Sequence, residues 1–204
     1  MTISIDIDEF KRGYKEFQKR EPRDAMYKIA VFIISHFWGN PALMADGLGV
    51  LLLTWNQAFY RYGSFDFDKL EQAIDSSLRA VENLRKRELT SLEAQDEARI
   101  KSLFGKFLNA LRIATGKKKG TKSPVAVAKA LHLLAPGFFP LWDDEIARAY
   151  HCHYSYKPEE KYLSFCYKIK EIAVQIPPSI SMGNKTLLKL IDEYNYAKYT
   201  KEWI

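Results

Sequence analysis

The segment Gly116-Lys-Lys-Lys-Gly-Thr-Lys-Ser123 interrupts a sequence in which one helical pattern follows another. Before it, apolar residues recur at steps of three and four positions, the period of one helix face. This apolar stripe consists of Ile100, Leu103, Phe104, Phe107, Leu108 and Leu111. After the segment, Ser123-Pro124 supplies an N-cap and a first-turn proline. The sequence therefore predicts a helix, a tight turn bounded by glycines, and a second helix.

Helical patterns extend outward from this turn in both directions, and no segment indicates a sheet. A length of 204 residues is typical of a single compact unit. The predicted fold class is all-α, with eight or nine helices. We expect helices over about 8–20, 24–37, 41–62, 66–87, 90–111, 124–135, 143–150, 158–176 and 185–196.

The composition excludes several classes of protein. Hydrophobic residues make up 47% and charged residues 27%, which excludes a disordered chain and a collagen-like repeat. The two cysteines, Cys152 and Cys166, cannot form a disulfide framework, and the chain does not open with a charged and then apolar leader. The longest apolar runs, 29–37 and 48–53, are too short to span a bilayer. We therefore expect a cytoplasmic protein that makes no contact with a membrane.

Positive charge is concentrated in the glycine-bounded turn. The chain carries a formal charge of +6, which favours polyanionic partners. Lys117, Lys118, Lys119 and Lys122 lie within a few positions of one another. Two glycines allow a tight turn in which amide N–H groups converge at the start of the next helix, and such a turn can hold a DNA phosphate. The glycine spacing does not match a nucleotide-binding P-loop. The alternative interpretation is a solvated loop.

A carboxylate follows the second helix of this pair. The sequence Ala130-Leu-His-Leu-Leu-Ala-Pro-Gly-Phe-Phe-Pro-Leu-Trp-Asp143-Asp144 takes an apolar helix through an aromatic loop to an acidic helix start. Aspartate is an ordinary N-cap, which is one interpretation of Asp143. Because the residues that precede it are strongly apolar, Asp143 can also be a partly desolvated carboxylate beside a cleft.

A third feature is Leu51-Leu-Leu-Thr-Trp55-Asn56-Gln57-Ala-Phe-Tyr-Arg61, where an apolar helix turns abruptly polar and aromatic. Amide side chains can read or replace a base, and a tryptophan can stack on one. The alternative is a helix end whose aromatic residues belong to the core.

The order of these features resembles that of the helix-hairpin-helix DNA glycosylases, which include endonuclease III and the 3-methyladenine glycosylases, over about residues 42–150. Gly120-Thr-Lys122-Ser123 is similar to the family's glycine-x-lysine-threonine hairpin, although the leucine-proline-glycine opening is missing. Asp143 stands in the place of the catalytic aspartate. The resemblance implies two helical halves around a DNA-facing cleft, approximately 42–122 and 1–41 plus 123–204.

The resemblance also implies a function. Such an enzyme flips a damaged or modified base out of the duplex and excises it, in repair or in defence against modified phage DNA, without a cofactor or metal. The expected partner is double-stranded DNA, and we expect a monomer. Asp143 would stabilise positive charge on the sugar and orient a water molecule. Lys122 would be the nucleophile of a lyase. Lys129, on the following helix, is a second candidate that no motif supports, and we favour its interpretation as a lysine that snorkels from a buried helix. Of the two routes we favour attack by water.

The remaining expected site residues fall into two groups. Those expected to contact DNA are Asn56, Gln57, Lys117, Lys118, Lys119, Gly120, Thr121 and Ser123. Those expected to form the base pocket are Trp55, Phe139 and Trp142.

Other patterns lead to rival interpretations. Arg148 and His153 are similar to the arginine-x4-histidine signature of the HEPN ribonucleases, which are also all-α. His151, Cys152 and His153 do not have the paired spacing of a zinc site, and two cysteines cannot hold an iron–sulfur cluster. A non-catalytic helical DNA-binding protein is the third alternative.

Overall fold

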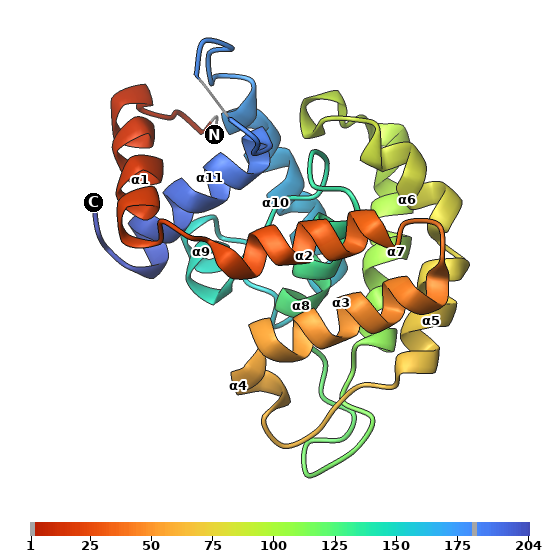
Figure 1. Cartoon of the computed structure of the whole chain (residues 1–204). Helices are drawn as coiled ribbons and strands as arrows, with labels where there is room; N and C mark the ends of the chain where they lie inside the picture. The colour runs from red at the N-terminus through yellow and green to blue at the C-terminus, as the bar shows by residue number, and fades with distance from the viewer. Residues whose placement is uncertain (1–2, 181–182) are drawn as a thin grey trace.

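The computed structural model describes residues 3–180 and 183–204, and the prediction of an all-α fold is confirmed. Within those ranges every regular element is helical (Figure 1). The α-helices are α1 (Ile7–Arg20), α2 (Ala25–His36), α3 (Pro41–Trp55), α4 (Gln57–Tyr60), α5 (Phe67–Asp75), α6 (Leu78–Arg85), α7 (Glu97–Ala110), α8 (Pro124–Leu134), α9 (Asp144–Ala149), α10 (Pro158–Ala173) and α11 (Leu187–Asn195). Three short turns, Leu89–Ser91, Ala94–Asp96 and the π-helical Tyr196–Thr200, complete the regular structure.

The described residues contain eleven α-helices rather than eight or nine because two expected helices are each divided. The first divides at Asn56, whose carbonyl oxygen accepts from the amides of Phe59 and Tyr60 and so begins α4. The second divides at Ser76, whose hydroxyl donates to the Gln72 carbonyl at 2.6 Å. A serine side chain that bonds the preceding turn competes with the helical backbone.

The start of α7 also differs from the prediction. The spacing of Thr90 and Glu93 predicts a capping box, whereas the box forms between Glu93 and Asp96, and α7 begins at Glu97. Asp96 is buried, and the Arg87 guanidinium donates to both of its carboxylate oxygens at 2.7 Å. These two hydrogen bonds from Arg87 hold the Asp96 carboxylate in place, so Asp96, rather than Glu93, is the acid at the third position of the capping box.

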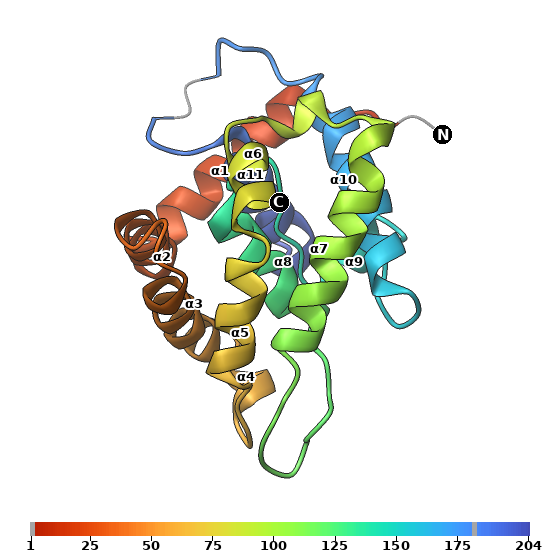
Figure 2. The same ribbon diagram turned by 90° about the vertical axis from the view of Figure 1, so that its right-hand side faces the viewer.

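The central element is α8, which packs against α2, α3, α6 and α7 (Figure 1). Around it α1 packs on α11, and α10 lies beside α7 (Figure 2). The expected boundary at 41/42 falls in the first turn of α3, and α2 packs on α3 across it. None of the described helices is long and apolar enough to cross a membrane.

Candidate active site

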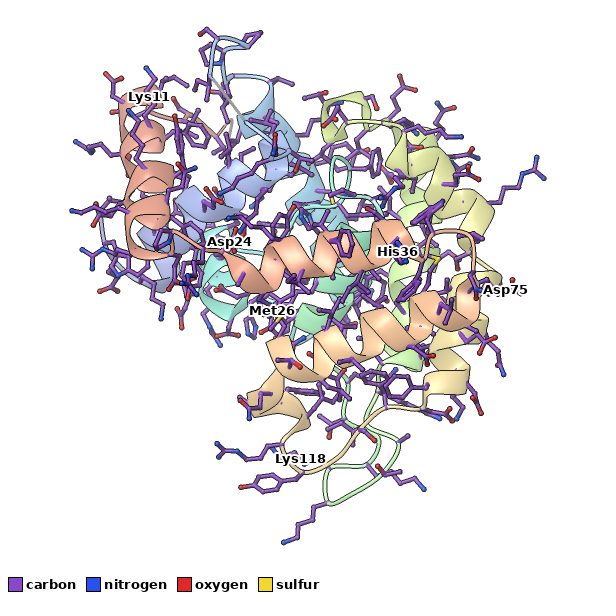
Figure 3. All side chains as sticks on the ribbon, in the orientation of Figure 1. Lys11, Asp24, Met26, His36, Asp75 and Lys118 are labelled. Carbon is purple, nitrogen blue, oxygen red and sulfur yellow. The ribbon has the colours of Figure 1, made fainter. Side chains whose placement is uncertain are left out.

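A cavity of about 270 Å³ lies where the C-terminal ends of α1 and α3 meet the starts of α2 and α9. Asp24, labelled in Figure 3, lies just before α2 and lines the cavity. Aromatic and charged side chains line it together, the usual mixture in a ligand site. They are Phe17, Glu21, Asp24, Trp55, Lys129, Leu141, Trp142, Asp143, Ile146, Lys189, Asp192 and Tyr196. The cavity thus brings together Asp143, Lys129, Trp55 and Trp142, four of the residues predicted from the sequence.

Asp143 lines the cavity and also caps α9. Its Oδ1 accepts from the Ile146 amide at 2.8 Å, and its Oδ2 accepts from the Thr200 hydroxyl at 2.6 Å. Both interpretations of Asp143, the cap and the carboxylate beside a cleft, therefore hold together. The two hydrogen bonds fix the carboxylate in one orientation, which a group that acts on a bound ligand requires.

Lys129 projects from α8 into the same cavity. Its Nζ donates to the Trp55 carbonyl at 3.2 Å and to Asn56 Oδ1 at 3.0 Å, and it lies 4.6 Å from the centre of the Trp55 ring. The ammonium is therefore satisfied by protein groups rather than by snorkelling into bulk water. Burial lowers the pKa of Lys129 to about 8, although the nearby carboxylates of Asp192 and Asp143 act in the opposite direction.

A second group of charges, which the sequence did not indicate, forms the far side of the cavity. Lys189, only 3% exposed, has its Nζ 3.2 Å from Asp192, 3.4 Å from Asp24 and 3.8 Å from Glu193. Burial raises the pKa of Asp192. In the sequence these residues are ordinary charges between apolar positions. The only signal was the spacing of three positions between Lys189 and Asp192, which is common on helix surfaces.

Asp24 adopts an uncommon backbone conformation. Its φ of 41° lies in the left-handed region, and its side chain makes no capping bond to α2. Its Oδ2 is buried and has no hydrogen-bond partner among the described residues, although it faces Lys189. Strained backbone of this kind collects at functional sites.

Of the three aromatic residues predicted to form the base pocket, two lie at the cavity and one does not. Trp55 is half-buried at the cavity, and Trp142, 1% exposed, forms its wall and donates through Nε1 to the Pro124 carbonyl. Phe139 does not line the cavity, so its assignment to the pocket needs correction. It is fully buried in the core, where its ring packs against Phe138 and Tyr162.

The lysine-rich turn forms a hairpin that projects from the body (Figure 3, Lys118). Lys117, Lys118 and Lys119 are exposed at its tip. The amides were expected to converge on a phosphate, but those of Lys119, Gly120 and Thr121 donate to carbonyls within the hairpin. The lysine side chains, rather than these amides, are therefore the groups available to an anion.

Two predictions at the C-terminal end of the hairpin, for Ser123 and for Lys122, also need correction. Ser123 is buried, and its hydroxyl accepts from the Ala126 amide at 3.2 Å, so it caps α8 and is not free to contact DNA. Lys122 is exposed and lies outside the set that lines the cavity. Lys129 is therefore the candidate lysine that the fold places with Asp143.

Asn56 and Gln57 have different surroundings. Asn56 Oδ1 accepts from Lys129, and its Nδ2 is buried without a hydrogen-bond partner in the described parts of the chain. Gln57 is exposed at the start of α4. Gln57 is thus the amide that can leave the surface, whereas Asn56 supports Lys129.

Arg148 and His153, the two residues of the ribonuclease interpretation, both contact Asp144. Arg148 Nε lies 2.7 Å and His153 Nε2 lies 2.9 Å from its carboxylate, which offsets the charge of the arginine. Cys152 and Cys166 are both buried and free. Among the described residues no group of three or more histidine, cysteine or acidic side chains is arranged to hold a metal ion.

Comparison of the chain with protein-family models, with curated proteins and with solved structures yields no significant match.

Proposed function

We propose that this protein is a DNA glycosylase that accepts a flipped-out damaged or modified base in the cavity and hydrolyses its bond to the sugar, leaving an abasic site. The observation that carries the proposal is the meeting of Asp143, Lys129 and Trp55 at one cavity. An oriented carboxylate, a buried cation and an aromatic face together suit a charged transition state beside a flat ligand.

Binding begins with the hairpin. Lys117, Lys118 and Lys119 neutralise phosphates without reading sequence. Flipping a base costs a few kcal/mol of unstacking, which these contacts offset. Gln57 fills the gap that the base leaves in the duplex, and Trp55 stacks on the extruded base.

Bond cleavage then depends on Asp143. As the base leaves, positive charge develops on the sugar, and the Asp143 carboxylate stabilises it and orients a water molecule toward C1′. With a pKa of about 8, Lys129 is mostly an ammonium ion at neutral pH, and this ion donates to two oxygens and lies over the Trp55 ring. A lysine held in this form is a poor nucleophile, and water is therefore the attacking group.

The test is incubation with a panel of modified duplexes and genomic DNAs, followed by alkali to reveal abasic sites. Asp143→Asn should keep its affinity for duplex DNA, because asparagine also caps helices, and should lose base release by on the order of 10²-fold or more. The control is Asp6→Asn, which makes the same change at the N-cap of α1 and should leave the rate unchanged.

Three outcomes would contradict the proposal in different ways. Full turnover by Asp143→Asn would remove Asp143 from the site. A covalent adduct trapped by borohydride would replace water with a lysine as the attacking group. Duplex binding by the wild type without an abasic product on any DNA would instead indicate a non-catalytic DNA-binding protein.

A further inference from the structure

A second concave surface lies beside the hairpin, between α5 and α7, which pack on each other (Figure 2). It consists of two neighbouring hollows of about 510 and 580 Å³. Both are lined by Lys69, Ala110 and Arg112, so they form one continuous groove, which we call the α5–α7 groove. None of its described lining residues also lines the cavity that contains Asp143, so the groove is a separate surface.

Positive charge prevails in the α5–α7 groove. The basic lining residues are Lys69 on α5, Lys106 on α7, Arg112 just after α7, and Lys119 in the hairpin. Among the described lining residues the only acid is Asp66, which caps α5 and lies 3.4 Å from the Lys69 ammonium. Four cations against one carboxylate leave three positive charges unbalanced, which favours a polyanionic ligand.

These cations are available to a ligand. Arg112 is exposed, and its side chain makes no ion pair or hydrogen bond with the described residues. Lys106 Nζ donates to the carbonyl oxygen of Ser76 at 3.3 Å and to its hydroxyl oxygen at 3.0 Å. Because both of these partners are neutral and an ammonium group has three N–H donors, Lys106 keeps its charge and a free donor.

The uncharged lining residues indicate the kind of polyanion. Gln72 and Asn109 are exposed amides that can donate to phosphate oxygens. The only aromatic side chain among the described lining residues is that of Phe65, which is 3% exposed and belongs to the core. Surfaces that bind single strands use exposed aromatic rings on which bases stack. The groove therefore suits a sugar–phosphate backbone whose bases are paired, as in a duplex.

We propose that the α5–α7 groove binds phosphates of the DNA duplex beyond those that the hairpin contacts. This inference rests on the DNA partner of the proposed function. Because Lys119 belongs to the hairpin and also lines the groove, a strand that leaves the hairpin enters the groove directly.

The size of the groove matches its charge. From Lys69 to Ser76 its α5 wall is about 10 Å long. One strand of a duplex carries a phosphate for about every 3.4 Å of axis, so the groove accommodates about three phosphates, one for each unbalanced positive charge. Since backbone contacts carry no sequence information, the groove adds affinity for every sequence alike.

The test is the affinity of the protein for unmodified duplexes of increasing length, measured by fluorescence anisotropy. The affinity of the wild type should rise until the duplex fills both the hairpin and the groove. For the double variant Lys106→Gln/Arg112→Gln this plateau should come at a length about 3 bp shorter, and the loss of affinity should grow with length up to it. On long duplexes the slope of log affinity against log salt should fall by about 0.9 for each phosphate that is no longer neutralised.

Two further variants accompany the test. Arg112→Gln alone removes no hydrogen bond between described residues and should give part of the loss. The matched control Lys86→Gln/Arg99→Gln removes the same charge from exposed positions outside the groove and should keep the wild-type plateau. Thermal melting of each variant establishes that it folds.

If the double variant keeps the wild-type plateau, or if the control shortens it equally, the role of the groove is overturned while the hairpin and the glycosylase function stand. Tighter binding of a single strand than of a duplex by the wild type would also overturn it. If the wild type shows the expected dependence on length but releases no base from any DNA, the groove stands as a duplex-binding surface and the glycosylase function falls.

Discussion

At the scale of single residues, Lys129 connects the chemistry of the cavity to the stability of the fold. Its pKa is about 8 in the folded protein because of burial, below the ordinary 10.5 that applies when the chain is unfolded. Between these values the unfolded chain binds more protons, so stability rises with pH. From about pH 7 to about pH 9.5 we expect Lys129 to add about 2 kcal/mol to the free energy of unfolding. Urea titrations of the wild type and Lys129→Met across this range measure the difference, and equal slopes against pH would show that Lys129 titrates normally.

Only part of the site could be predicted from the sequence at this scale. Asp143 and Trp55 stood out because a carboxylate and an aromatic ring follow apolar helices, a pattern visible along the chain. Asp192 and Asp24 did not stand out, because what distinguishes them is burial beside Lys189, a contact between distant parts of the sequence. Phe139 was misassigned because an aromatic residue next to a site has the same sequence signature whether it faces the core or the cavity.

At the scale of elements, the cavity depends on the close approach of α1 to α11, which bring Phe17 and Asp192 to it. A Cβ on Gly13 would lie 2.6 Å from the Tyr194 ring and 3.3 Å from the Tyr194 Cα, so alanine must push the two helices apart. We expect Gly13→Ala to lower the free energy of unfolding by about 1–3 kcal/mol. Gly105→Ala is the control within α7: a Cβ there meets nothing within 4 Å, and the alanine should stabilise by about 0.5–1 kcal/mol. Denaturant unfolding measures the free energy of unfolding of both variants. Equal changes in this free energy would mean that α1 and α11 are not closely packed.

Helix positions were predicted well, because apolar periodicity, proline at the first turn and N-cap residues are local signals. The helices α3 and α8 begin at Pro41 and Pro124, as expected. The breaks at Asn56 and Ser76 were missed, because they depend on individual hydrogen bonds. The Asn56 carbonyl starts a new helix, and the Ser76 hydroxyl competes with the helical backbone. The packing of α2 on α3, which crosses the expected division of the chain, depends on tertiary contacts that no local pattern shows.

At the scale of the whole molecule, the two parts of the proposed site make separable contributions, since the hairpin supplies affinity and the cavity supplies chemistry. Replacing Lys117, Lys118 and Lys119 with glutamine should weaken binding to every duplex alike and should reduce the slope of log affinity against log salt by about 0.9 for each phosphate that the hairpin no longer neutralises. The rate of base release at saturating protein should stay the same, because the hairpin lysines lie outside the set that lines the cavity. Substituting three other exposed residues removes the same total charge and controls for net charge alone. They are Arg79 in α6, Lys86 directly after α6, and Arg99 in α7. Fluorescence anisotropy over a salt series measures both variants. If the two triple variants shift the slope equally, overall charge rather than the hairpin attracts DNA, and the hairpin is a solvated loop.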